Sequence, residues 1–416
     1  MRILFVVQRY GAKVAGGAEA LTRMFAERLV VGGHRVSVLS SAATDYRSWV
    51  DDMDVGTSIE HGVTVHRCHV PRPRDAARFA GISARTFSRR NRPCSVLEGA
   101  WMCEQGPIPE GFATRLLDTA ADHDVIVFMT YLYATTVLGL PLVAEIRPTV
   151  LYPAAHDEAP FRLPSIRRAF DLATGIACST EEESDLVARR FRPGAPRHVI
   201  GIGFDPPPTG DPRRFRERHG LGEDPYLIVL GRIDPNKGSD EAASHLLRYR
   251  AERNRPVRIV FMGMGAMELP THPAIVVTGF VEDRERWDGL AGATALVQPS
   301  YQESFSMALA EAWQARRPAL VQGQCAVLDG FARRSRAALS YRTYSEFATA
   351  LDLLIENPDL GTELGETGAA YVDAELSWPP VLARFEDLLK SSAEEFRLRQ
   401  RALRVVAPAA GSPPDL

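Results

Sequence analysis

The sequence lacks the features that mark membrane-spanning, disulfide-stabilised or metal-binding chains. Its five cysteines have neither CxxC nor other metal-ligand spacing, and such a sparse, odd set is typical of reduced thiols in the cytosol. No apolar run approaches the ~18 residues that span a bilayer, and the opening "MRILFVVQRYG" is too short for a signal peptide. The formal net charge of -3 gives no overall attraction for nucleic acid. We therefore expect a cytoplasmic protein.

The length and the strand pattern predict two α/β domains. A chain of 416 residues is too long for one ordinary hydrophobic core. It opens with "RILFVV", a continuous apolar run typical of a parallel strand buried on both faces. Leu21, Phe25 and Leu29 then repeat along one helix face, and Gly32 ends that helix before the next strand. Continued alternation predicts a doubly wound, Rossmann-like domain over residues 1–202.

A stretch rich in proline and glycine, residues 203–212, interrupts this alternation and predicts an interdomain linker. The alternation resumes in a second Rossmann-like domain over residues 213–375. Residues 376–400 predict a C-terminal helix that packs back toward the first domain, and residues 401–416 a disordered tail. Two such domains would face a cleft at the carboxyl ends of their parallel strands, where open α/β sheets bind ligands.

Two cations follow the first strand of the second predicted domain. Arg232 and Lys237 stand five positions apart on the short loop "GRIDPNKG". A guanidinium fork and a compact ammonium at a strand's carboxyl end are suited to neutralise a diphosphate. The alternative is a pair of ordinary solvated cations.

Two glutamates stand out in "YQESFSMALAEAWQA", residues 301–315. From Phe305 onward the segment predicts a helix that is apolar on nearly all sides and therefore buried. Within it Glu311 is a lone charge that requires a donor, because burying a carboxylate costs several kcal/mol. Glu303 lies eight positions earlier, a spacing that suits a long ligand. The alternative is that Glu311 simply pairs with Arg316.

The predicted helix start between the glutamates is a candidate anion-binding site. The backbone N–H groups of Ser304, Phe305 and Ser306 would be without helical partners there, and the helix dipole favours a negative charge at that end.

The order of motifs resembles the family 4 retaining glycosyltransferases of GT-B fold. The E-x7-E motif follows a "PS" turn and is preceded by G-R-x4-K-G. Other matching pieces are "GGAE" at 16–19, "AHD" at 155–157, "ACSTEEE" at 177–183, "IGIGFD" at 200–205, "MGMG" at 262–265 and "TGFV" at 278–281. The likeness covers about residues 2–390, and the N-terminal half is similar to a bacterial subgroup with poorly defined acceptors.

The resemblance implies a role for each candidate residue. Arg232 and Lys237 would hold the diphosphate of a nucleotide sugar donor, Glu303 the hydroxyls of the transferred sugar and Glu311 the ribose hydroxyls. His156 would contact the donor sugar near the reacting carbon. Further donor contacts would come from Gly16, Gly17, Gly231, Phe280 and Val281, with the last two beside the base.

A segment rich in arginine, residues 72–92, has seven arginines against one acid, Asp75. Arg85, Arg89 and Arg90 could meet an anionic acceptor or a membrane surface at the inner face. A solvated loop is an equally good interpretation, and nucleic acid is the weakest.

Together these features predict transfer of a hexosyl unit from a nucleotide diphosphate sugar to a hydroxyl, with retention and with neither metal nor cofactor. Glycan, glycolipid or secondary-metabolite synthesis would be its setting. The alternatives are a nucleotide-sugar epimerase and a catalytically silent nucleotide-sugar-binding protein. A dinucleotide-dependent dehydrogenase is disfavoured, because "YGAKVAGGAEA" lacks the G-x-G-x-x-G fingerprint. The nucleotide, the sugar, the acceptor and the oligomeric state stay open.

Overall fold

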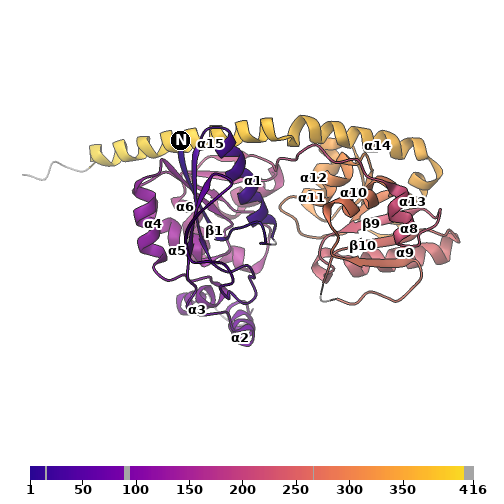
Figure 1. Ribbon diagram of the computed structural model, residues 1–416, viewed down its shortest axis with the longest axis horizontal. Helices are drawn as coiled ribbons and strands as arrows, with labels where there is room; N and C mark the ends of the chain where they lie inside the picture. Colours follow the sequence, from indigo (N-terminus) through magenta and orange to yellow (C-terminus); the bar gives the residue numbers. More distant parts are fainter. Residues whose placement is uncertain (15, 89–93, 266, 407–416) are drawn as a thin grey trace, which may run out of the picture. The chain divides into compact units, whose positions relative to one another are not determined.

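The computed structural model describes residues 1–14, 16–88, 94–265 and 267–406. The chain divides into two compact units, each with its own largely parallel sheet and its own hydrophobic core (Figure 1). The predicted fold class of two Rossmann-like domains is therefore confirmed. Unit 1 comprises Met1–Ser179, Glu183–Ile200 and the chain from Leu382 onward, and unit 2 comprises Thr180–Glu182 and Gly201–Val381.

Unit 1 is built on an eight-stranded sheet in the order β3-β4-β2-β1-β5-β6-β7-β8, parallel except that β3 runs antiparallel to β4. Its strands are β1 (Arg2–Arg9), β2 (Arg35–Ser41), β3 (Gly56–Glu60), β4 (Val63–Cys68), β5 (Val125–Met129), β6 (Thr149–Tyr152), β7 (Gly175–Cys178) and β8 (Arg197–Val199). Its helices are α1 (Gly17–Val31), α2 (Ala76–Thr86), α3 (Ser95–Gln105), α4 (Phe112–Ala121), α5 (Ala134–Val143), η1 (Ala159–Arg162), α6 (Pro164–Leu172) and α7 (Glu181–Phe191).

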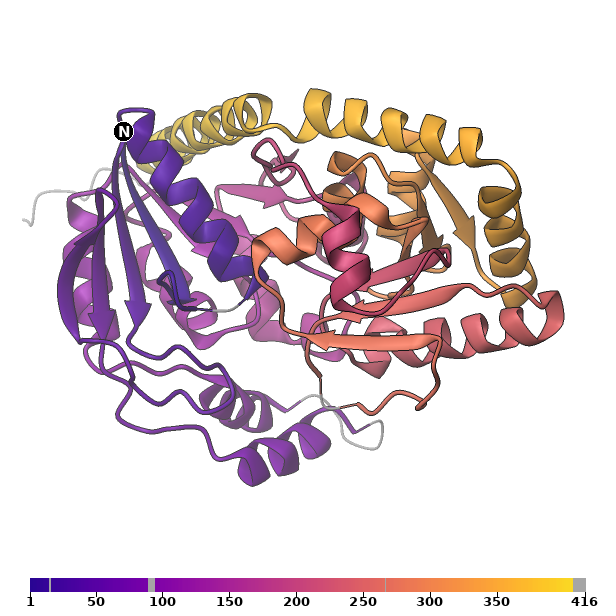
Figure 2. The same cartoon turned by 45° about the vertical axis from the view of Figure 1, so that its right-hand side comes forward.

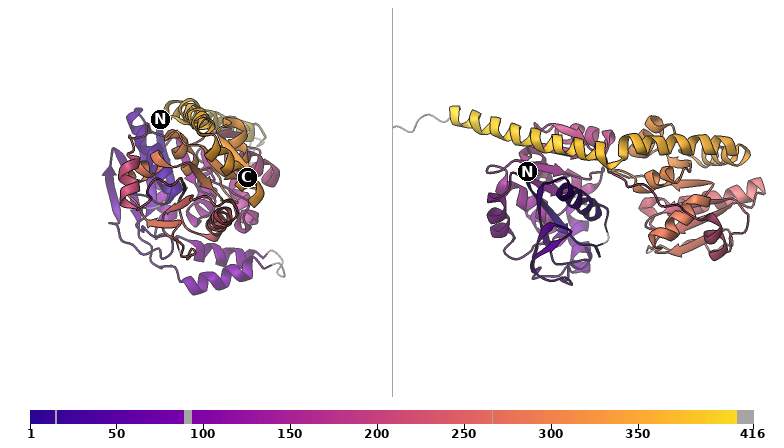
Figure 3. Two further views of the ribbon diagram at one scale, coloured as in Figure 1. Left: turned by 90° about the vertical axis from the view of Figure 1, so that its right-hand side faces the viewer. Right: turned by 45° about the horizontal axis from the view of Figure 1, so that its top comes forward.

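The apolar pattern of the sequence explains why β1 and α1 are buried in the core of unit 1. Leu21, Phe25 and Leu29 form the buried face of α1, as the sequence predicts. The last helix, α15 (Trp378–Val406), also packs here: the ring of Phe385 lies 4.5 Å from that of Phe25 and 6.2 Å from that of Phe5. Figure 3 shows this helix, in yellow, running alongside unit 1.

Unit 2 is built on a six-stranded, wholly parallel sheet in the order β11-β10-β9-β12-β13-β14. Its strands are β9 (Tyr226–Leu230), β10 (Arg258–Met262), β11 (Ile275–Gly279), β12 (Ala295–Gln298), β13 (Ala319–Gln322) and β14 (Ala338–Tyr341). Its helices are α8 (Pro212–Arg218), η2 (Pro235–Lys237), α9 (Ser239–Arg253), α10 (Asp283–Gly292), α11 (Met307–Gln314), α12 (Ala326–Ser335), α13 (Tyr344–Glu356), α14 (Pro358–Tyr371) and η3 (Val372–Leu376).

The strand order fixes where each unit can bind a ligand. In unit 2 the chain winds from β9 to β10 and β11 on one side, then returns to place β12, β13 and β14 on the other. The winding direction therefore reverses between β9 and β12, and open α/β sheets bind ligands beyond the carboxyl ends of strands at such a point. In unit 1 the same reversal falls between β1 and β5.

Some details differ from the sequence predictions. β3 and β14 were not predicted, because β3 is an exposed polar edge strand and β14 is a short edge strand that is only partly buried. Asp211, within the predicted linker, caps α8 through its side chain. α15 continues to Val406, past the predicted helix end at 400, and residues 407–416 of the predicted tail lie outside the described residues. No helix among the described residues is long and apolar enough to cross a membrane.

Candidate functional site

Two neighbouring loops of unit 2 meet at the point where its winding reverses. One follows β9 and carries Arg232 and Lys237, and the other follows the adjacent strand β12 and carries Glu303. Gly238 lets the loops touch: its φ is +67°, and a Cβ there would lie 2.3 Å from the carbonyl oxygen of Pro299. The strand order thus brings together three residues that the sequence predicts as one site.

Lys237 and Glu303 form an ion pair across these loops. Lys237 Nζ lies 2.7 Å from Glu303 Oε1, and Gln298 Nε2 donates to the same oxygen at 3.0 Å. The side chains of the pair are 34% and 13% exposed. The carboxylate is therefore fixed by two donors while the ammonium stays open to an anion. Gln298 was not predicted, and its position as the last residue of β12 was the available signal.

Arg232 lies on the same loop and is half exposed. Its Nε pairs with Asp234 Oδ2 at 3.3 Å. Asp234 also accepts a hydrogen bond from the backbone of Asn236 at 2.8 Å, which caps η2. Asp234 thereby shapes the turn that presents both cations, a role that the sequence reasoning missed.

The "MGMG" motif explains how this loop reaches its position. Gly231 N donates to Met262 O at 3.0 Å, and Ile233 N donates to Met264 O at 3.2 Å. A Cβ at Gly263 would lie 1.9 Å from Gly231 O, and one at Gly265 would lie 1.8 Å from Ile233 O. The loop after β10 therefore supports the cation loop through backbone contacts that only glycine permits.

The helix after Glu303 begins later than predicted. α11 starts at Met307, and its N-cap is Ser306, whose Oγ accepts from Leu309 N. The first helical turn therefore leaves the N–H groups of Ser306, Met307 and Ala308 without helical partners. The prediction that Ser304 and Phe305 also stand at the helix start is wrong, because Ser306 keeps extended backbone angles as the cap.

Glu311 lies on a half-buried face of α11, with 12% of its side chain exposed. Burial on all sides was predicted and is wrong, since Met307, Ala308 and Gln314 share this partly open face. Burial raises the pKa of Glu311; Arg286, with Nη2 at 3.6 Å, opposes this and Asp283 adds to it.

The partner of Glu311 differs from the one that the alternative interpretation named. Arg316 pairs with Glu366 instead, so the cation beside Glu311 is Arg286 from α10. Arg286 Nε is buried and has no hydrogen-bond partner among the described residues. Sequence reasoning missed Arg286, which lies 25 positions before Glu311 on another helix.

Phe280 and Val281 directly follow the edge strand β11, two strands away from β9. Phe280 is 82% exposed, whereas Val281 is half-buried. An aromatic ring that is this open contributes little to the core of unit 2.

The "GGAE" motif of unit 1 serves an internal ion pair. Arg9 Nη2 and Gln8 Nε2 both donate to Glu19 Oε1, and the Arg9 and Glu19 side chains are each 4% exposed. A Cβ at Gly16 would lie 2.1 Å from Glu19 Oε2, whereas nothing surrounds the missing Cβ of Gly17. Gly16 is thus required by packing, and only Gly17 offers open backbone.

His156 belongs to a hydrogen-bonded group in unit 1. Its Nε2 lies 3.5 Å from Glu158 Oε2, and Tyr131 donates its hydroxyl to the other oxygen of Glu158. Burial would raise the pKa of Glu158, but His156 and Tyr131 outweigh it and lower that pKa. Glu158 and Tyr131 were not predicted.

A buried carboxylate positions the loop that carries His156. Glu183 accepts the backbone N–H groups of Ala155 and Ser179, and burial raises its pKa to about 7.

The arginine-rich segment folds mainly as helix α2, capped by Asp75, and not as a loop. Phe79, Ile82 and Phe87 pack against the core of unit 1. Arg85 lines a cavity between α2 and α3, whereas Arg89 and Arg90 lie outside the described residues. Over the part of the chain that the structure describes, no three His, Cys, Asp or Glu side chains gather as metal ligands.

Comparisons with known proteins agree with this geometry. Residues 224–357, most of unit 2, match the family model described as Glycosyl transferases group 1. A D-inositol 3-phosphate glycosyltransferase 2 of Catenulispora acidiphila is 29% identical over 64% of this chain and 69% of its own. A D-inositol 3-phosphate glycosyltransferase of Frankia alni is 26% identical over 89% of this chain and 93% of its own. The structure of HepE from Anabaena in complex with UDP superposes with a TM-score of 0.67 at 15% identity, over 94% of this chain and 100% of that chain.

The fold and the site therefore define the class: the chain is a glycosyltransferase of the GT-B fold. It carries a glycosyl transferases group 1 domain, and the resemblance to family 4 seen in its sequence is confirmed.

Proposed function

We propose that the chain transfers a hexosyl unit from a nucleotide diphosphate sugar to an acceptor hydroxyl, with retention and without a metal ion. One observation supports this most directly: Lys237, Glu303 and Gln298 meet where the winding of unit 2 reverses. An ammonium beside a fixed carboxylate offers a contact for phosphate and an acceptor for sugar hydroxyls.

The charges of the site fit a departing diphosphate. In glycosyl transfer, negative charge builds on the leaving group, and positioned cations that face it lower the barrier. Arg232 and Lys237 would supply that charge, assisted by the amides of Ser306 and Met307, which have no partner within α11. No residue is assigned as a covalent nucleophile; retention rests on the resemblance to family 4, with the leaving phosphate taking the acceptor's proton.

The half-buried face of α11 fits the nucleoside part of the donor. Glu311 would accept from the ribose hydroxyls, and the unpartnered Nε of Arg286 would donate to a ribose or phosphate oxygen. The exposed ring of Phe280 would cover the base, with Val281 beside it. We propose a UDP-sugar as the first candidate, because Anabaena HepE has been solved with UDP and with UDP-glucose.

The family resemblance also assigns donor contacts to residues of unit 1. His156, held by Glu158, is proposed to contact the transferred sugar, and Gly17 to let backbone approach the donor. These two roles rest on the family resemblance. The chain would work in the cytoplasm, with peripheral contact at the inner face of the membrane left open.

Calorimetry with UDP and UDP-glucose tests the donor site. Lys237→Ala and Glu311→Ala should each weaken binding by more than ~1 kcal/mol, because each removes a charged hydrogen-bond partner. Lys390→Ala and Glu366→Ala are matched controls, since these side chains are exposed surface ion-pair partners. Unchanged affinity in both site variants would refute this placement.

Product analysis then tests the reaction. With donor and a panel of hydroxyl acceptors we expect a glycoside of unchanged anomeric configuration. Conversion of the donor to an epimer in the absence of any acceptor would instead identify an epimerase.

A further inference from the structure

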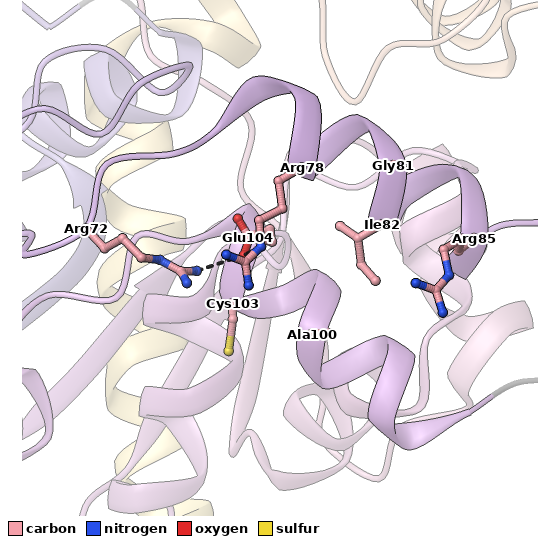
Figure 4. Close-up of a pocket in the computed structure, with 8 residues that line it drawn as sticks. All are labelled: Arg72, Arg78, Gly81, Ile82, Arg85, Ala100, Cys103 and Glu104. Carbon is pink, nitrogen blue, oxygen red and sulfur yellow. Dashed lines mark hydrogen bonds and ion pairs between the residues drawn. The ribbon is translucent and has the colours of Figure 1, made fainter.

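A cavity of about 450 Å³ lies between α2 and α3 in unit 1 (Figure 4). Its charged lining consists of Arg72, Arg78, Arg85 and Glu104. An adjoining cavity of about 250 Å³ shares Arg72, Cys103 and Glu104 and extends toward Trp49. No role proposed above uses this space.

The lining is arranged for an anion. It carries three guanidinium groups and one carboxylate, an excess of two positive charges. The carboxylate is already neutralised: Arg72 Nη2 lies 2.8 Å and Arg78 Nε 2.9 Å from Glu104 Oε1. Glu104 is only 6% exposed, whereas the side chains of Arg72 and Arg78 are 56% and 64% exposed.

Glu104 therefore acts as a support that holds two arginines in fixed positions. A guanidinium has five N–H donors in a planar fork, and the bond to Glu104 uses only part of them. In Figure 4 the guanidinium groups of Arg72 and Arg78 converge on Glu104, and Arg85 projects from α2 farther along the cavity. Fixed guanidinium forks with donors to spare are the usual partners of phosphate oxygens.

The apolar residues of α2 argue against insertion into a membrane. Phe79 and Phe87 contact the ring of Trp101, with ring centroids 6.4 Å and 5.2 Å away. Together with Ile82 they pack against the core, so the apolar side of α2 is already half-buried. A helix that binds the lipid interface needs that side free.

The cavity lies beyond the edge of the sheet at which unit 1 would meet substrate. α2 follows β4, and both α2 and α3 lie beyond the carboxyl ends of the strands (Figure 2). Arg74, in the adjoining cavity, lies over the ring of Trp49, which packs edge-on against Tyr133 in the loop after β5. The lining of the adjoining cavity is thus in contact with the loop at which the winding of unit 1 reverses.

We propose that this cavity binds the phosphomonoester group of a small phosphorylated acceptor. The inference rests on the proposed transferase function and adds the class of acceptor. Two excess positive charges match a phosphomonoester, which carries between one and two negative charges at neutral pH.

The chain contains its own probe for this binding. Cys103 is exposed and lines the cavity. Cys94, the N-cap residue of α3, is also exposed but does not line the cavity, so it serves as the internal control. Alkylation of both thiols by a neutral maleimide, followed by peptide mass spectrometry, should show that inorganic phosphate and glucose 6-phosphate slow the labelling of Cys103 alone. Sodium chloride at equal ionic strength and glucose should have no effect. Equal protection of both cysteines, or of neither, would overturn the proposal.

Variants test the arginines. Arg78→Gln and Arg85→Gln should each raise the phosphate concentration that half-protects Cys103 about tenfold, equivalent to ~1.4 kcal/mol. Arg167→Gln, an exposed arginine of unit 1 paired with Asp171, is the matched control and should behave as the parent protein. Arg85 does not pair with Glu104 in Figure 4, so its variant leaves the support intact if Arg78→Gln disturbs folding. Parent-like protection in both arginine variants would contradict the assignment.

Two further measurements distinguish a soluble phosphate from a lipid headgroup, and this inference from the proposed function. Phosphatidylglycerol vesicles that protect Cys103 where soluble phosphates fail would show a lipid headgroup site and overturn the small acceptor. UDP-glucose binding, measured by calorimetry, should be unchanged in Arg78→Gln. If the parent protein does not bind UDP-glucose but phosphate still protects Cys103, the proposed function alone is refuted. If it binds UDP-glucose but phosphate does not protect Cys103, only this inference is refuted.

Discussion

The two units use the carboxyl edge of a parallel sheet in different ways. In unit 2 the charged pair at this edge, Lys237–Glu303, is open, with side chains 34% and 13% exposed. In unit 1 the corresponding pair, Arg9–Glu19, is sealed, with both side chains 4% exposed. The same sheet geometry thus yields a partly exposed charged pair in one unit and an internal structural bond in the other. Burial decides which, because a ligand cannot reach a pair whose side chains are almost fully buried.

The largest expected effect breaks the sealed pair. Glu19→Ala leaves Arg9 buried without its carboxylate, and removing one partner of a buried pair costs ~3–5 kcal/mol. Chemical denaturation should show that loss in the unfolding of unit 1. Glu27→Ala, on the same helix but in partly exposed pairs with Arg23 and His61, is the control and should change stability by less than ~1 kcal/mol. A small loss in Glu19→Ala would mean that the pair is not structural.

The second effect concerns a buried acid of unit 1, Glu183. Burial raises the pKa of Glu183 from 4.5 to about 7. Since the folded state then binds more protons than the unfolded state, the stability of unit 1 should fall as pH rises from about 4.5 to about 7, and then level off.

Thermal unfolding of Glu183→Gln across this pH range checks the prediction. The variant cannot titrate, so this fall should be missing from its pH profile even if its overall stability is lower. Parallel profiles for the two proteins would exclude Glu183 as the titrating group.

The third effect comes from removing one partner of the partly exposed pair in unit 2. Lys237→Ala should weaken UDP binding by ~1.5–3 kcal/mol, the size of a hydrogen bond to a charged group. The stability of unit 2 should change by less than ~1 kcal/mol, as for other partly exposed pairs. Calorimetry and denaturation of the same sample measure both. A variant that unfolds easily but still binds UDP would reverse the contrast between the units.

The smallest effect concerns Phe280. Phe280→Ala removes a ring that is 82% exposed, so stability should change by less than ~0.5 kcal/mol. Loss of stacking on a base should weaken UDP binding by about 1 kcal/mol. Comparing the affinities for UDP and for inorganic diphosphate isolates the contribution of the base, since the substitution should weaken only the binding of UDP.

The sequence predicts most of the strands, because continuous apolar runs such as β1 and β9 are typical of buried parallel strands. It also places Arg232, Lys237 and Glu303 on loops after strands. What it cannot supply is distance in space. Arg286 beside Glu311, and Arg9 beside Glu19, become neighbours only when separate elements pack.

The arginine-rich segment shows a second limit of sequence reasoning. Its local composition gives one acid for seven arginines. Glu104, which follows on the next helix, neutralises two of them and changes an apparent surface patch into a lined cavity. Charge balance along the chain does not predict charge balance in space.

Gly263 and Gly265 have no functional group, yet each would place a Cβ within 2 Å of the backbone that carries Arg232. In a scan of all single substitutions, they should therefore be as intolerant as the charged residues that they support. A survey that ranks positions by the functional groups of their side chains would overlook these glycines. A survey that ranks positions by their tolerance of substitution would group them with Arg232. The conformation of the loop that carries Arg232 is therefore constrained by glycines about thirty residues farther along the chain.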